Sequence, residues 1–202
     1  MSKSLIKTLS IKPPKELQPF LEDFHLVGDE TAEDYVNLFV AIAMAAKPAN
    51  TIDWLYIKDV ADLTWDIRRE RSIKAAIIES NRKEVVLDLL KATVDDPVSV
   101  RSHVYRIFGA AGEVMRWSVD SEAKKEINAK LTASGYPPSE VLARAYIKGA
   151  AQIDAVDRRI ASYEMRKMLI LREVEHRNER LSRRLEKASS EIIDAEFSEA
   201  AE

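Results

Sequence analysis

Residues 138–192 read PSEVLARAYIKGAAQIDAVDRRIASYEMRKMLILREVEHRNERLSRRLEKASSEI, a helical pattern with hardly a break that decides the fold. Apolar residues recur through it mostly in steps of three, four or seven, which is the spacing of one helix face. Roughly fifty residues at a rise of about 1.5 Å each make a rod of about 80 Å. One compact domain does not bury a stripe of that length, so we expect part of it to pack against another long helix. The stripe consists of Ile153, Val156, Ile160, Met168, Leu171, Val174, Leu181, Leu185, Ala188 and Ile192.

The composition favours an all-α protein. Of the 202 residues, 46% are hydrophobic and 32% are charged, which is typical of a globular chain. Glycine occurs only 5 times, and the sequence lacks the Asn-Gly and Asp-Gly pairs that form tight β-hairpins. The formal net charge of −3 gives no global field toward nucleic acid or an anionic membrane.

The sequence also bounds the setting. There is no cysteine, so disulfides and thiolate chemistry are excluded. The amino terminus lacks the apolar core of a signal peptide, and no apolar run reaches the length of a membrane span. We therefore expect a soluble, cytoplasmic protein without membrane contact.

Capping and turn signals place the individual helices. Thr31 can cap the first helix, because Asp34 follows three residues later. Asn50 or Thr51 is suited to cap the second, and Gly135 can take the left-handed position after the fourth. Val98-Ser99-Val100 could instead form a short strand. The expected helices span residues 32–46, 52–92, 97–117 and 121–132, followed by the long helix from Pro138.

These elements suggest four parts of the chain. A compact helical body holds a core in which we expect Phe39, Trp54, Leu55, Leu63 and Ile67 to be buried together. The long carboxy-terminal helix leaves this body near Gly149 as a coiled-coil-like arm. The predicted parts are a flexible basic arm over 1–30, the helical body over 31–149, a long charged amphipathic helix over 150–193 and an acidic tail over 194–202.

One stretch of the second helix carries a resemblance. Residues 52–66 read IDWLYIKDVADLTWD, and residues 71–75 read RSIKA. Together with IASYEMR at 160–166 and LREVEHR at 171–177, they resemble a family of helical proteins from alphaproteobacteria that has no assigned activity. The likeness covers about residues 50–197. It implies a bacterial cytoplasmic setting and transfers no site and no mechanism.

Acidic residues on one helix face suggest a cation site. Asp59, Asp62 and Asp66 lie three and four residues apart, as in helices that hold Mg²⁺ and a diphosphate. Such a site needs a second acidic helix opposite, and the sequence offers none. Lys58, Arg69 and Arg71 are near enough to neutralise the carboxylates, so we favour a charge-paired helix surface.

Two Glu-x-x-His pairs match the spacing of di-iron helix bundles. Glu22 and His25 lie near Pro19, outside a good helical pattern, and Glu173 and His176 lie among charged neighbours. A carboxylate-bridged site also needs inward glutamates from two further helices, which the apolar stripes lack. We predict that Asp59, Asp62, Asp66, Glu173 and His176 bind no metal.

Catalytic motifs are otherwise missing from the sequence. It has no Gly-rich phosphate loop, no Gly-x-Ser-x-Gly elbow and no His-Glu-x-x-His. Three histidines and no cysteine leave few groups for nucleophilic or proton-transfer chemistry. We expect a protein that is not an enzyme and needs no cofactor.

Nucleic-acid binding has one basic cluster to support it. Arg68, Arg69, Arg71 and Lys74 lie next to Trp65, although acidic residues alternate with them. A helix-turn-helix outline around residues 131–146 is explained as well by an antiparallel helix pair. Accessory nucleic-acid binding through the Arg68–Lys74 surface is the alternative function.

The favoured function is helix-mediated assembly. The apolar stripe extends beyond the reach of the second helix, which is about 60 Å long. Because exposed apolar seams are usually buried against a partner, we expect dimerisation or a protein partner in a structural or adaptor role. The predicted partner-binding residues are Val174, Leu181, Leu185 and Ile192.

Overall fold

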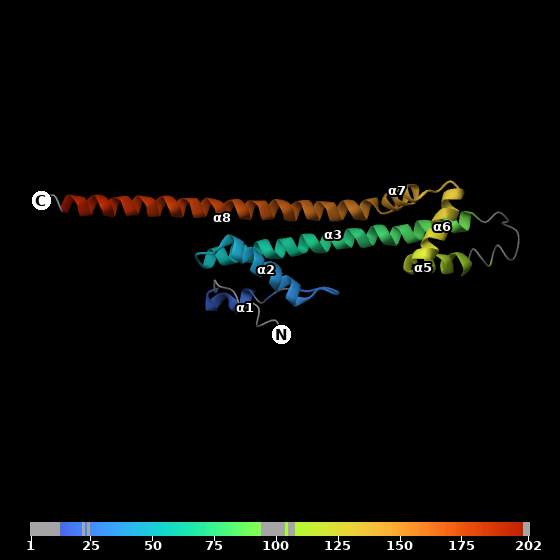
Figure 1. The fold of residues 1–202 in the computed structure, drawn as a ribbon, viewed down its shortest axis with the longest axis horizontal. Coiled ribbons are helices and arrows are strands. Elements are labelled where there is room, and N and C mark those ends of the chain that lie inside the picture. The colour runs from blue at the N-terminus through green and yellow to red at the C-terminus, as the bar shows by residue number, and fades with distance from the viewer. Residues whose placement is uncertain (1–12, 22, 24, 94–103, 105–107, 200–202) are drawn as a thin grey trace. The chain divides into compact units, whose positions relative to one another are not determined.

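The computed structural model describes residues 13–21, 23, 25–93, 104 and 108–199, and these residues contain helices and no β-strand. The fold is therefore all-α, as the sequence predicted. After a 3₁₀ turn at Lys15–Leu17, the helices are α1 (Gln18–Leu21), α2 (Ala32–Ala46), α3 (Thr51–Ala92), α5 (Ala110–Val119), α6 (Ser121–Ala133), α7 (Pro138–Lys148) and α8 (Ala150–Glu199) (Figure 1).

The predicted caps are confirmed. Thr31 Oγ1 accepts a hydrogen bond of 3.1 Å from the Asp34 amide and so caps α2. Asn50 Oδ1 accepts bonds from the Ile52 and Asp53 amides at the start of α3. After α6, Gly135 adopts the left-handed region at φ 89°, where an L side chain is strained.

The chain divides into two compact units, and both α3 and α8 contribute to each. Unit 1 comprises residues 1–68 and 161–202, and unit 2 comprises residues 69–160. The sequence instead suggested parts divided at residues 30, 149 and 193. That organisation stays a prediction, although Leu17, within the predicted flexible arm, is buried in the core of unit 1.

The core of unit 1 lies between α2 and the first half of α3. Phe39 stacks on Trp54 at a ring separation of 6.2 Å, and Tyr35 meets Trp65 edge-on at 5.6 Å. These aromatic contacts add to the area buried between the two helices. The core consists of Leu17, Tyr35, Val36, Phe39, Ala43, Trp54, Ile57, Ala61 and Trp65.

The prediction of the core is wrong for one residue. Phe39, Trp54, Leu63 and Ile67 are all buried, but 42% of Leu55 is exposed. The reason is the helical phase, because Leu55 lies about 160° around α3 from the buried Ile57. The apolar residues of this helix did not by themselves reveal which of its faces is exposed to solvent.

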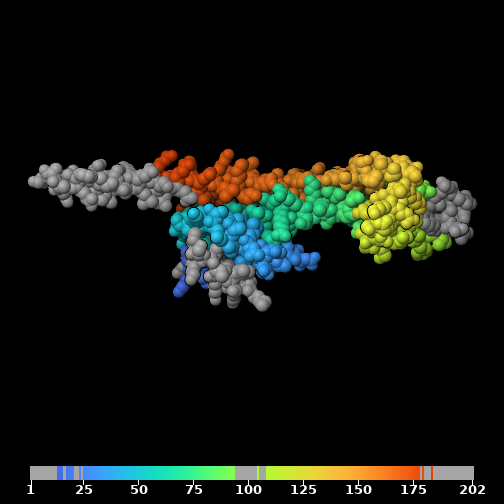
Figure 2. All heavy atoms as spheres, in the orientation of Figure 1, coloured from blue at the N-terminus to red at the C-terminus, as the bar shows by residue number. Residues whose placement is uncertain are grey.

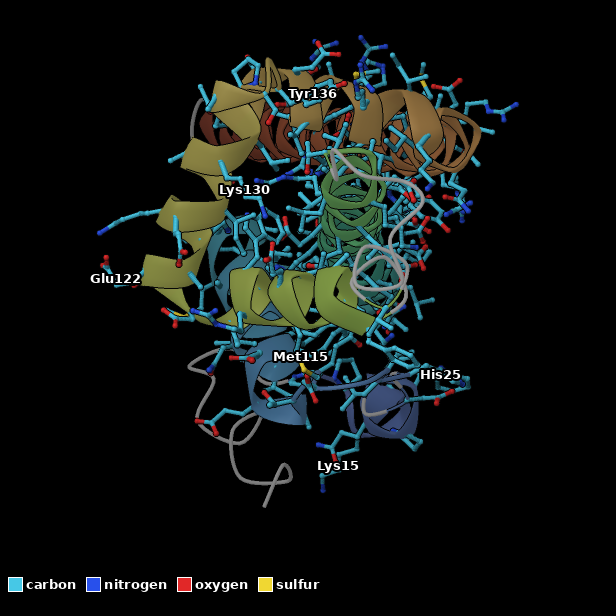
Figure 3. The ribbon with its side chains drawn as sticks, turned by 90° about the vertical axis from the view of Figure 1, so that its right-hand side faces the viewer. Lys15, His25, Met115, Glu122, Lys130 and Tyr136 are labelled. Carbon is cyan, nitrogen blue, oxygen red and sulfur yellow. The ribbon has the colours of Figure 1, made fainter. Side chains whose placement is uncertain are left out.

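The core of unit 2 joins the second half of α3 to α5, α6 and α7. Trp117 is buried, donates a 3.0 Å hydrogen bond to Asn128, and lies against the cations of Arg82 and Lys124. Glu122 and Lys130 lie on α6, and the exposed Met115 lies on α5 (Figure 3). The core residues are Val85, Val86, Leu89, Leu90, Ala110, Trp117, Ile127, Leu131, Val141 and Ala145.

The expected long helix is interrupted at Gly149. Helix α7 ends at Lys148, and the Gly149 amide bonds back to the carbonyls of Ala145 and Ile147. A Cβ atom at residue 149 would collide with the side-chain amide of Asn81 on α3. Glycine therefore allows the chain to approach α3 closely where α8 begins.

Within unit 2, α8 is sealed against α3. Ile153 and Val156 are buried, with 5% and 1% of their surface exposed. Arg159 donates two hydrogen bonds, of 2.6 and 2.9 Å, to the carboxylate of Glu70. This paired geometry is the strongest form of an arginine–carboxylate contact.

The expected helix over 97–117 is only partly tested. The structure describes α5 from Ala110 to Val119, which overlaps its second half. The alternative strand at residues 98–100 lies outside the described residues.

Candidate interaction surface

Unit 1 contains an apolar groove between α2, α3 and α8. Its volume is about 810 Å³. Val60 and Thr64 contribute from α3, while Lys167, Arg172 and Glu175 are its charged lining residues on α8. The remaining lining is aliphatic or methionine side chain, from Leu38, Ile42, Ala45, Ala46, Met168, Leu171 and Val174.

Helix α8 keeps large apolar side chains exposed within unit 1. Met168 and Leu171, which line the groove, are 42% and 48% exposed. Met165 and Leu169 are 55% exposed each. In Figure 2 this orange stretch of α8 borders α2 and the start of α3. Apolar side chains that gather at this density mark surfaces for protein contact.

The half-buried residues of α8 define its inward seam. In unit 1 they are Tyr163, Lys167, Ile170, Val174 and Arg177, spaced four, three, four and three residues apart. This spacing continues from Ile153, Val156 and Ile160, and it is the period of a helix that accompanies another helix. The sequence prediction missed the seam because Lys167 and Arg177 are charged, although a strict three-four alternation could have found it.

Arg177 of α8 lies near the level at which α3 begins. Its guanidinium lies over the ring of Tyr56 at 5.6 Å, a cation–π contact. Because Tyr56 is five residues after Thr51, the start of α3, the antiparallel α8 passes that point at about residue 182. Figure 1 shows α8 continuing beyond the start of α3.

The four predicted partner-binding residues fall into two groups. Val174 is half-buried and lines the apolar groove. Leu181, Leu185 and Ile192 belong to α8, but they lie outside the residues whose side chains the structure describes. A role for these four residues in binding stays a prediction.

The basic cluster is divided between the two units. Arg68 belongs to unit 1, and its guanidinium lies over the Trp65 ring at 5.0 Å. Lys74 belongs to unit 2 and pairs with Asp157 at 2.7 Å. The hydrogen bond from this ammonium to Asp157 raises the pKa of Lys74. Arg69 and Arg71 also have interactions, so these bases do not form a bare surface.

The acidic face of α3 is engaged by neighbouring groups. Asp62 pairs with Lys58 at 2.6 Å and accepts a short hydrogen bond from the Tyr35 hydroxyl. Burial raises the pKa of Tyr35 above its ordinary value, and the bond to Asp62 adds to that rise. Partial desolvation raises the pKa of Asp59, with a further contribution from Asp62. Asp66 also has an interaction partner.

Among the described residues, no three or more metal-ligating side chains lie close enough together to hold a metal ion. Glu173 and His176 are exposed on α8, and His25 is exposed after α1. Glu22 lies outside the described residues. That Asp59, Asp62, Asp66, Glu173 and His176 bind no metal stays a prediction for metal analysis. None of the described helices has the length and hydropathy to cross a bilayer.

Comparisons of the chain with protein-family models, with curated proteins and with solved structures find no match. The resemblance to the alphaproteobacterial family therefore stays an expectation from the sequence.

Proposed function

We propose that this protein acts by helix-mediated assembly and self-associates through the carboxy-terminal half of α8, as a coiled-coil dimer. Its role is structural or adaptor-like, in the cytoplasm of a bacterium, and involves no catalysis. The observation that carries the proposal is that α8 continues past the level at which α3 begins. Arg177 is beside Tyr56, so about seventeen residues of α8 continue past the start of α3.

The exposed apolar residues of unit 1 support the same function. Met165, Leu169 and Leu171 are about half exposed, and the groove beside them has an apolar lining. Burying apolar area contributes about 25 cal/mol per Å², so covering several such side chains favours association. A helix laid against this face is a recurring mode of protein recognition.

Light scattering after size exclusion tests the proposal on the full chain. We expect a dimer at protein concentrations of tens of micromolar. A contact that buries several leucines should reach micromolar affinity, which corresponds to about 8 kcal/mol. The double variant Leu185→Gln, Ile192→Gln removes two apolar positions of the stripe and should be monomeric. Ser190→Gln lies on the other side of the helix and should leave the dimer unchanged. A full chain that is monomeric at these concentrations would refute self-association.

Accessory nucleic-acid binding through Arg68, Arg69, Arg71 and Lys74 has weaker support. Lys74 is paired with Asp157, and Arg68 lies over an aromatic ring. Binding carried by these residues would weaken steeply with added salt, by about one unit of log–log slope for each phosphate contact. Absence of binding to DNA and RNA at low salt would leave assembly as the function.

A further inference from the structure

Among the described residues, no long helix accompanies the end of α8 (Figure 1). Helix α3 starts at Thr51 and α2 ends at Ala46, and the two are joined by a short turn at this same level. The stretch of α8 beyond residue 182 extends to Glu199, which is roughly 25 Å of helix. Most of the stability of a helix in a protein comes from packing of its apolar face, so a partner beside this stretch would stabilise it.

The sequence of this free end (residues 183–199) continues an apolar stripe. Leu181, Leu185, Ala188 and Ile192 follow one another in steps of four, three and four residues. This is the spacing of a helix that packs along a second helix. The middle of the free end has the small residues Ala188 and Ser189 on or next to this stripe, and they allow two helices to approach closely where they cross.

Charge is distributed unevenly along the end of α8. Residues 178–187 hold four bases and two acids, a net charge of +2, whereas residues 188–199 hold four acids and no base, a net charge of −4. The bases are Arg180, Arg183, Arg184 and Lys187, and the acids of the second half are Glu191, Asp194, Glu196 and Glu199.

We propose that the partner of the free end is the same segment of a second copy, packed antiparallel about a two-fold axis near Ser189. In this orientation the basic half of each helix lies along the acidic half of the other. A parallel pair would place two acidic halves together and two basic halves together. Flanking charges of this kind determine the orientation of paired helices.

The antiparallel register also brings the two apolar stripes together. With the axis at Ser189, Leu185 lies within one residue of the level of Ile192 of the second copy, and the two copies of Ala188 lie two residues apart along the helices. Arg184 is level with Asp194 by the same count. The contact uses the same patch on both chains, so it closes on itself and yields a dimer rather than a filament.

Single-cysteine variants test the orientation, because the natural chain contains no cysteine. This inference rests on the proposed self-association, so light scattering is measured on the same samples. Ser182→Cys and Ala195→Cys chains are co-expressed with different tags and treated with a short bis-maleimide cross-linker. In the antiparallel pair residue 182 of one chain is nearly level with residue 195 of the other, so we expect the mixed product.

The controls separate the two orientations. Ser189→Cys alone should cross-link, because the two copies of residue 189 meet at the axis. Ser182→Cys alone should not, because its two copies are about 20 Å apart along the helices. Cross-linking of Ser182→Cys with itself, without the mixed product, would establish a parallel pair and overturn the inference. A dimer that cross-links at none of these positions would place the interface elsewhere and overturn the inference while retaining assembly. A monomer would refute both.

Discussion

Helix α8 contributes to both units, and its inward residues are covered to different degrees in the two. In unit 2, Ile153 and Val156 are at most 5% exposed, and Arg159 closes the edge by pairing with Glu70. In unit 1 the inward residues Ile170 and Val174 are only half-buried, and Met168 and Leu171 next to them remain 42% and 48% exposed beside a groove. One continuous helix thus packs closely in its first turns and keeps apolar surface exposed in later ones.

The residues at the seam explain this difference. Aliphatic side chains at the seam in unit 2 pack closely, and close packing excludes water. The seam in unit 1 includes Lys167 and Arg177, whose long stems pack on apolar surface while their charges stay near water. Such a seam is held less tightly, which is consistent with a surface that is completed by another chain.

The largest expected effect is the loss of stability when a buried residue of α3 in unit 1 is truncated. Leu63 is 4% exposed, so Leu63→Ala should lower the free energy of unfolding by about 2–5 kcal/mol. Leu55→Ala, at a residue that is 42% exposed on the same helix, is the matched control and should cost less than about 1 kcal/mol. Chemical denaturation measures both. Equal losses in the free energy of unfolding would mean that Leu63 is not more buried than Leu55.

The contact between α8 and α3 in unit 2 is tested by Glu70→Ala. Glu70 is buried and accepts both hydrogen bonds from Arg159, whose side chain is 46% exposed. We expect a loss of about 1–2 kcal/mol, reduced from the value for a fully buried pair by solvent screening. Arg144→Ala breaks the exposed pair with Glu140 and should cost less than about 0.5 kcal/mol. A Glu70→Ala protein as stable as the Arg144→Ala protein would contradict the sealing role.

The smallest effect concerns the polar contact between α2 and α3 in unit 1. The pKa of Tyr35 is raised above its ordinary value of 10.0, first by burial and then by its bond to Asp62. The unfolded chain therefore loses this proton first, and the stability that Tyr35 contributes below pH 10 declines as the pH rises above 10. One proton corresponds to a slope of up to about 1.4 kcal/mol per pH unit. Tyr35→Phe should remove that part of the slope, as measured by denaturation between pH 9 and 11 (about the range that a tyrosine titration covers). An unchanged slope would show that Tyr35 is not protected from ionisation.

Local signals in the sequence were sufficient to place most helices. Thr31, Asn50 and Gly135 are capping or turn residues whose chemistry acts within one helical turn, so the sequence alone reveals them. The interruption at Gly149 depends on Asn81, which is 68 residues away, and no local pattern contains that contact. For the same reason the pair of Glu70 with Arg159 was not predicted.

The interaction surface was predicted only in part. The apolar count identified Val174, which lines the groove, but it assigned Met168 and Leu171 to the buried stripe with Ile153 and Val156. Periodicity indicates that a helix has an apolar face, but it does not indicate how much of that face the rest of the chain covers. That quantity depends on where α2 and α3 end.

The central claim is that the end of α8 is held by a second copy of the chain. Amide hydrogen exchange of the full chain, measured at several protein concentrations, tests this most directly, because it reports local opening along one helix. We predict that the protection of residues 183–199 increases with protein concentration, while residues 150–160, sealed within unit 2, keep a constant protection. Rapid exchange of residues 183–199 at every concentration, or protection that does not depend on concentration, would contradict the account.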